Sequence, residues 1–199
     1  MKKKGDFRRE LREEYSNSWS FIKKSSFFIW FGVATFFILA FVGFFAKVPE
    51  ELSLQILDYF RELVKMTEGY GSFKMISFLF FNNLKASFFG MILGVVFGII
   101  PLFYLLGNGF ILGFASRFAV AQEGLFSLWR LLPHGIFELP AIFLSLGLGL
   151  KIGSGLFEKK NKWKALKNYF IESLKVFALI ILPLLVVAAV VEGLLISLL

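Results

Sequence analysis

The chain has 199 residues, a formal net charge of +8 and no cysteine, and 57% of its residues are hydrophobic. Soluble domains are only about 45–50% apolar, and a water-soluble fold of this size could not bury 28 Phe side chains beneath a polar surface. The mean hydropathy of +0.74 agrees with a lipid environment. The lack of cysteine excludes disulfides, thiolate metal sites and thiol nucleophiles.

Residues 1–26 carry both signs of charge, and apolar residues such as Leu11, Trp19 and Ile22 fall near helical spacing. This pattern predicts an amphipathic helix on the cytoplasmic membrane surface. Residues 27–46 then run for about 20 positions without a charged residue, which is long enough to cross a bilayer. We expect the first transmembrane helix there.

Residues 50–74 predict a second amphipathic segment, because apolar residues recur every three or four positions with charged residues between them. Its low Lys and Arg content favours the outer face of the membrane. The second span is predicted at 75–106. It contains Gly90, Gly94 and Gly98 at steps of four, which form a flat stripe for close helix packing and a candidate dimer contact.

The next stretch is predicted to be interrupted. The tripeptide Gly-Asn-Gly at 107–109 predicts a turn. The apolar run at 110–121 that follows is short for an independent span, and it contains Arg117.

The run at 125–150 is longer, but Pro133, Gly135 and Pro140 predict helix breaks within it. Two short or broken spans fit 107–150, and so does a re-entrant pair of half-helices. Both arrangements return the chain to the same side of the membrane.

Residues 151–175 hold seven Lys and two Glu, which places this segment in the cytoplasm by the positive-inside rule. The last span is predicted at 176–199. The sequence therefore predicts an all-α, polytopic transmembrane helix bundle of about five hydrophobic segments in a single membrane domain. We expect a multi-pass plasma-membrane protein with its N-terminus in the cytoplasm and its C-terminus outside.

The positive charge has two candidate partners, nucleic acid and lipid. The basic residues flank apolar spans, and no module of aromatic and basic residues lies between them. Contact with anionic lipid headgroups explains this placement, so no nucleic acid is expected.

Polar residues inside the predicted spans are costly and mark candidate sites. They are His134, Glu138, Glu192, Asn82 and Asn83. His134 and Glu138 are four residues apart and share one helix face. The functional interpretation is a proton or cation site completed by Glu192. The structural interpretation is that these groups join neighbouring helices by hydrogen bonds.

Catalysis is not expected. His134 is the one histidine, so a His-Glu-x-x-His zinc motif is excluded, and neither a Gly-x-Ser-x-Gly elbow nor a paired-Asp motif of intramembrane proteases occurs. One His with two Glu could in principle hold a metal, but no ligand spacing supports it. We expect a non-enzymatic protein without a metal or cofactor.

The run Pro-His-Gly-Ile-Phe-Glu-Leu-Pro-Ala at 133–141 resembles the signature of the stage II sporulation protein M (SpoIIM) family. The Asn82-Asn83 pair and Glu192 within Val-Val-Glu-Gly are similar to two further marks of that family. The resemblance implies a multi-spanning membrane protein. In endospore formers the family's namesake acts with a wall-degrading partner machine at the engulfing membrane, although members also occur in organisms that do not sporulate.

Two functions remain open from the sequence. The first is a non-enzymatic membrane scaffold that recruits envelope-remodelling partners, as a homodimer or with other membrane proteins. The second is a transporter or channel subunit, in which carboxylates at broken helices line a site near the bilayer midplane. The second requires the carboxylates to converge within the bundle.

Overall fold

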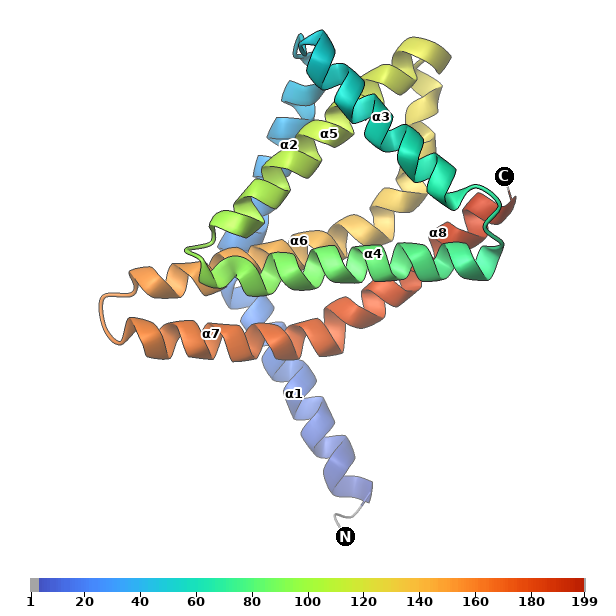
Figure 1. Ribbon diagram of the computed structural model, residues 1–199. Helices are drawn as coiled ribbons and strands as arrows, with labels where there is room; N and C mark the ends of the chain where they lie inside the picture. Colours follow the sequence, from blue (N-terminus) through green and yellow to red (C-terminus); the bar gives the residue numbers. More distant parts are fainter. Residues whose placement is uncertain (1–3, 199) are drawn as a thin grey trace.

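The structure is a computed structural model that describes the backbone of residues 4–198 and the side chains of residues 8–129, 136 and 138–195. Within these residues all regular structure is helical (Figure 1). Within the part of the chain that the structure describes, five helices are long and apolar enough to cross a membrane, which confirms the predicted class and count. These candidate spans are Ser26–Phe45, Ser72–Val95, Ile99–Glu123, Glu138–Phe157 and Lys162–Leu195.

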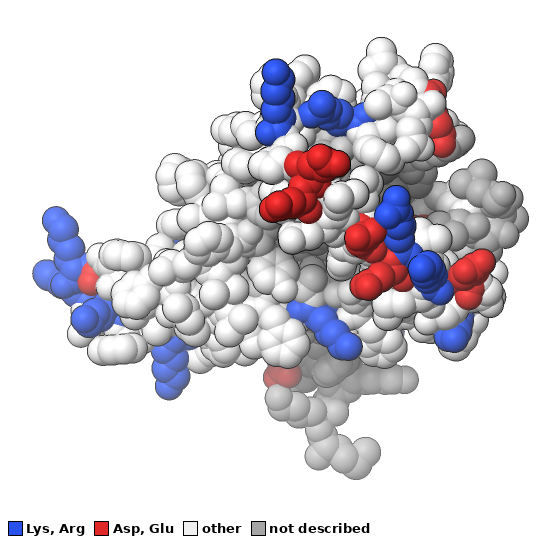
Figure 2. Space-filling model, turned by 45° about the horizontal axis from the view of Figure 1, so that its top comes forward, with Lys and Arg blue, Asp and Glu red and all other residues white. Residues whose placement is uncertain are grey.

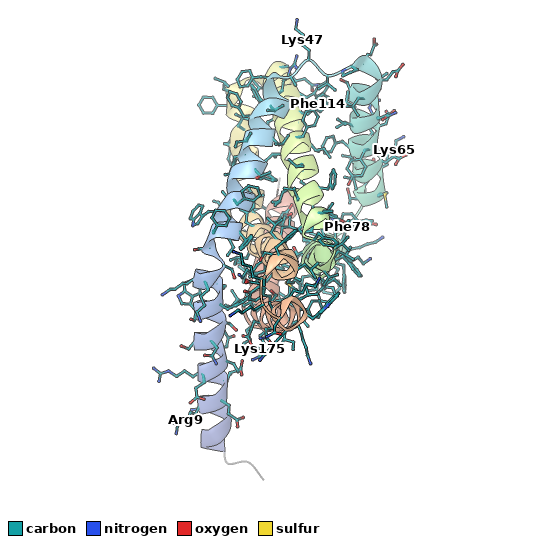
Figure 3. All side chains as sticks on the ribbon, turned by 90° about the vertical axis from the view of Figure 1, so that its left-hand side faces the viewer. Arg9, Lys47, Lys65, Phe78, Phe114 and Lys175 are labelled. Atoms are coloured by element: carbon teal, nitrogen blue, oxygen red, sulfur yellow. The ribbon has the colours of Figure 1, made fainter. Side chains whose placement is uncertain are left out.

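The two N-terminal helices follow one another almost in line (Figures 1 and 3). They are α1 (Lys4–Lys24) and α2 (Ser26–Phe45), so the predicted helix and first span are both present. One face of α1 packs on the C-terminal part of the chain, where Nζ of Lys175 lies 3.1 Å from a carboxylate oxygen of Glu14. The aromatic residues Tyr15 and Trp19 stay exposed on its other side.

Helix α3 (Glu50–Thr67) is the predicted amphipathic segment, and it crosses in front of α5 in Figure 1. It buries Ile56 while Val64 stays exposed. Its location on the outer face of the membrane stays a prediction.

The second and third spans differ from the prediction. Helix α4 (Ser72–Ile92) continues into a short 3-10 turn, η1 (Leu93–Val95), and α5 runs from Ile99 to Glu123. A single span at 75–106 is therefore wrong, because the chain reverses at Phe97 and Gly98, which have φ angles of 54° and 72°. Only glycine adopts this left-handed region without strain, and Gly98 supplies it directly before α5.

The predicted turn at 107–109 is also wrong, because these residues lie inside the uninterrupted 25-residue helix α5. The short span at 110–121 is wrong for the same reason. Gly109 serves close packing, since a Cβ there would collide with the carbonyl oxygen of Phe36 in α2. The Asn108 side chain donates to the carbonyl of Tyr104 one turn earlier, which keeps Asn108 compatible with the helix.

The fourth span is a bent helix. A 3-10 segment, η2 (Leu125–Leu131), leads into α6 (Leu132–Ser154), which ends in η3 (Gly155–Phe157). Pro140 lies within α6, so the predicted helix break there is wrong. The first turn of α6 tolerates Pro133, because its missing N–H would have no partner there, and the helix also continues through Gly135. The helix changes direction along its length in Figure 1, as an internal proline commonly causes.

The C-terminal span begins as the basic helix α7 (Lys162–Val176), passes through a π-helical turn, η4 (Phe177–Ile181), and ends as α8 (Leu182–Leu198). Lys side chains gather at the turn between α6 and α7, at the left of Figure 2. The predicted basic segment at 151–175 thus lies at one end of the bundle.

Glycines allow two helix pairs to pack backbone against backbone. In α2 and α5, a Cβ at Gly109 or Gly113 would collide with carbonyl oxygens of the facing helix. In α4 and α6, Gly94 meets the backbone of Gly149. The predicted packing role of Gly90, Gly94 and Gly98 is thus served by α6 of the same chain, and Gly98 lies past the end of the helix.

These contacts also give the directions of the spans. Gly32 meets Leu105 and Ala40 meets Gly113, so α2 and α5 run parallel. Gly94 meets Gly149 and Gly98 meets Gly153, so α4 and α6 run parallel. In contrast, α8 runs antiparallel to α4. Figures 1 and 3 show that α2 and α5 cross α4 and α7 at a steep angle, so the two sets of helices point in different directions.

One long-range hydrogen bond caps the first span. The Arg117 guanidinium donates to the carbonyl oxygen of Ala46 at 2.6 Å, across 71 residues of sequence. Ala46 is the C-cap of α2, where helical carbonyls lack partners and a positive charge is favourable. Arg117 thus ties the C-terminal part of α5 to the end of α2.

We expect Gly113→Ala to lower the free energy of unfolding by about 1–3 kcal/mol, because overpacking forces α2 and α5 apart. Gly107→Ala is the matched control on the same helix, since no atom lies within 4 Å of its new Cβ. That control should be neutral or stabilising by up to about 1 kcal/mol. Unfolding in mixed detergent micelles measures both, and equal losses would contradict the described α2–α5 contact.

Candidate functional site

Three buried polar side chains lie where helices α4, α6 and α8 pack together. Asn83 belongs to α4, Glu138 to α6 and Glu192 to α8, and their exposed fractions are 7%, 6% and 7%. Each of these helices contacts the other two. We call these three residues the polar seam. Their burial shows that the carboxylates turn away from the lipid-facing surface.

The register of α4 against α6 brings Glu138 near the level of Asn83. The Ser145 hydroxyl donates to the carbonyl oxygen of Ser87 at 2.6 Å, which fixes how the parallel helices align. Counting back seven residues along both helices puts Glu138 level with position 80 of α4. It is therefore about one turn from Asn83 along the bundle.

The register of α8 brings Glu192 to the other side of Glu138. Gly193 packs on Ile76, and the rings of Phe88 and Phe177 lie 5.2 Å apart, so α8 runs antiparallel to α4. Glu192 is then level with about position 77 of α4. By this count the levels of the three polar residues along α4 span about 9 Å, with Glu138 in the middle.

The surroundings of the polar seam are apolar. Ala141, one turn after Glu138, is fully buried in a core cluster with Leu185, against which Phe80 and Leu84 pack. Carboxylates in such surroundings are costly unless they accept hydrogen bonds, pair with a neighbour or take up a proton. The seam therefore suits either helix–helix bonding or reversible proton binding.

The structure does not bring every predicted residue to the seam. Asn82 is exposed on another face of α4, because consecutive helical residues point about 100° apart. The side chain of His134 lies outside the described residues, as do those of Pro133 and Gly135. Their backbone forms the first turn of α6, directly before Glu138.

Two residues that the sequence did not single out support the seam. Ser87 and Ser145 are 1% and 0% exposed, and they join α4 to α6 one to two turns beyond Asn83 and Glu138. The sequence could have indicated them, because each serine lies one or two helical turns after a polar residue of the seam and such residues commonly bridge membrane helices.

The fold and seam define a polytopic α-helical membrane protein with ionisable groups between its spans. Its family is given by sequence comparison: the model of the family described as "Stage II sporulation protein M" matches residues 27–195. The chain belongs to this family, as the resemblance at 133–141 implied. The matched region includes the whole polar seam.

Two uncharacterised proteins of Methanocaldococcus jannaschii are similar to the chain. One is 32% identical over 137 residues, which cover 66% of this chain and 60% of that protein. The other is 34% identical over 115 residues, covering 56% of this chain and 65% of that protein. The chain thus spans less than two thirds of either relative's length. No solved structure matches the chain.

We expect Ser145→Ala to lower the free energy of unfolding by about 1 kcal/mol, because it removes a hydrogen bond between two spans. Ser77→Ala is the matched control, since the Ser77 hydroxyl donates to Phe73 within its own helix. The control should change stability by less than about 0.5 kcal/mol. Unfolding of both variants in the same micelles compares them, and an equal effect would argue against a specific α4–α6 bond at this site.

Proposed function

We propose that the chain is a non-enzymatic membrane scaffold or assembly component in envelope or membrane remodelling. The observation that carries this proposal is the enclosure of the polar seam among closely packed helices. Buried polar groups in such a place commonly hold helices in a fixed arrangement. Membership of the stage II sporulation protein M family supports the same conclusion.

The ends of the bundle offer surfaces for partners. Helices α1 and α7 pack together and both carry charged residues. The Lys175 ammonium of α7 pairs with Glu14 of α1, and it also lies 3.3 Å from the carboxylate of Glu172 in α7. Helix α3 presents charged and apolar residues together, including the ion pair of Arg61 and Asp58 at 2.8 Å. Exposed surfaces that combine charged and apolar residues suit the recruitment of other proteins and contact with lipid headgroups.

A second candidate is a transporter or channel subunit that moves protons, ions or small solutes. The specific observation in its favour is that Glu138 and Glu192, from different helices, lie within about one turn of each other in register. Two irregularities in these spans would permit movement: Pro140 within α6, two residues after Glu138, and the π-helical turn at 177–181, about three turns before Glu192.

Glu138→Gln and Glu192→Gln distinguish the two functions, because Gln keeps the shape and hydrogen bonding of Glu but cannot ionise. A scaffold predicts that the variants change thermal stability or co-purification of partner membrane proteins, with no effect on ion flux. Flux is measured in proteoliposomes with an internal pH-sensitive dye. The native chain could instead carry a proton- or ion-dependent flux that these variants lose while they fold and assemble normally. That result would overturn the scaffold proposal and establish a transporter function.

A further inference from the structure

A groove runs along the outward face of the first half of α4, on the opposite side from the polar seam. It has a volume of about 310 Å³. Its lining residues are Tyr70, Lys74, Ser77, Phe78, Phe81, Asn82 and Lys85. The α4 residues among them recur every three or four positions, so they share one helix face. This face is free of the glycines and serines that pack against α6.

The groove lies within a candidate membrane span, Ser72–Val95, and it is open to the surroundings of the bundle. Phe81 is 55% exposed, and Asn82 and Lys85 are also exposed. In a bilayer this face therefore meets lipid. Amide and ammonium groups on a lipid-facing helix are costly unless they find a polar partner.

The charge of the groove is positive. Lys74 and Lys85 contribute two ammonium groups, and none of the seven described lining residues is acidic. Lys74 holds its Nζ 3.9 Å from the centre of the Tyr70 ring, at the end of α4 nearest the membrane surface. Lys85 lies 13 residues into the helix, about 20 Å along its axis.

The direction of helical side chains brings the Lys85 ammonium toward the N-terminal end of the groove. Side chains on an α-helix lean toward its N-terminus, so Lys85 extends back past Asn82 toward Lys74. A lysine at this depth normally snorkels toward headgroup phosphates. The groove offers a path by which a phosphate can meet it, with the rings of Phe78 and Phe81 beside the path.

We propose that this groove binds the headgroup phosphate of an anionic phospholipid from the leaflet at the α3–α4 end. The ammonium group of Lys85 pairs with the phosphate and the Asn82 amide donates to it, while Lys74, held over the Tyr70 ring, adds positive charge at the outer end of the groove. Phe78 and Phe81 contact the start of an acyl chain. A lipid fits better than a free anion because the groove is open on the lipid-facing side and its walls are aromatic.

Native mass spectrometry of the full chain tests this proposal. The protein is released from nanodiscs that contain phosphatidylcholine and increasing fractions of phosphatidylglycerol, and the retained phosphatidylglycerol is counted. Lys85→Gln should weaken retention about fivefold, and Lys85→Arg should restore it because the positive charge is kept. Lys65→Gln is the matched control, because Lys65 is exposed on α3 and does not line the groove (Figure 3).

Three outcomes would overturn the proposal. The first is unchanged lipid retention in both Lys74→Gln and Lys85→Gln. The second is displacement of the lipid by millimolar inorganic phosphate, which would indicate a site for a soluble anion. The third is a change in oligomeric state of Lys85→Gln without loss of lipid, which would make this face a protein contact. Circular dichroism and thermal unfolding confirm that each variant is folded.

Discussion

Close approach of helix backbones at glycine is the constraint on which the rest of the structure depends. A Cβ at Gly113 would collide with a carbonyl oxygen of α2, and a Cβ at Gly94 with one of α6. In a bilayer, lipid is as apolar as the side chains, so helices associate through such packing and through hydrogen bonds. These contacts fix the α2–α5 and α4–α6 pairs in register.

That register determines where the costly polar groups lie. Because the Ser145 hydroxyl donates a hydrogen bond to the carbonyl oxygen of Ser87, the buried Glu138 lies within about one helical turn of Asn83 along the axis of α4. Antiparallel packing of α8 then brings Glu192 to the other side of Glu138. The polar seam is thus a consequence of backbone packing at positions several turns away. Its enclosure between spans supports an architectural role in preference to a solvent-facing reaction site.

Much of this fold could be predicted from the sequence, because hydrophobic length and charge are local properties. The first span, the amphipathic α3 and the basic α7 follow directly from them. Glycine was ambiguous, since it serves both turns and close contacts. At Gly109 it permits helix packing, whereas at Gly98 it permits a reversal of the chain. Local sequence does not distinguish these uses, because the difference depends on the facing helix.

For the candidate site too, some features follow from the local sequence and others depend on how the helices pack. The cost of burying Glu138, Asn83 and Glu192 was evident from their residue types, and all three are buried. The adjacent Asn82 has the same side chain as Asn83, but it is exposed because it points to another face of α4. The bonding partner Ser145 depends on the alignment of α4 with α6, which only the fold determines.

Oxidative cross-linking in native membranes tests the central claim, that α4 and α6 meet in the register that forms the polar seam. The chain has no native cysteine, so Ser87→Cys with Ser145→Cys introduces a single pair. The account predicts rapid disulfide formation within one chain, because these residues are in direct contact. Asn82→Cys with Ser145→Cys is the control and should remain reduced. Failure of the first pair, or equal cross-linking of both, would contradict the account.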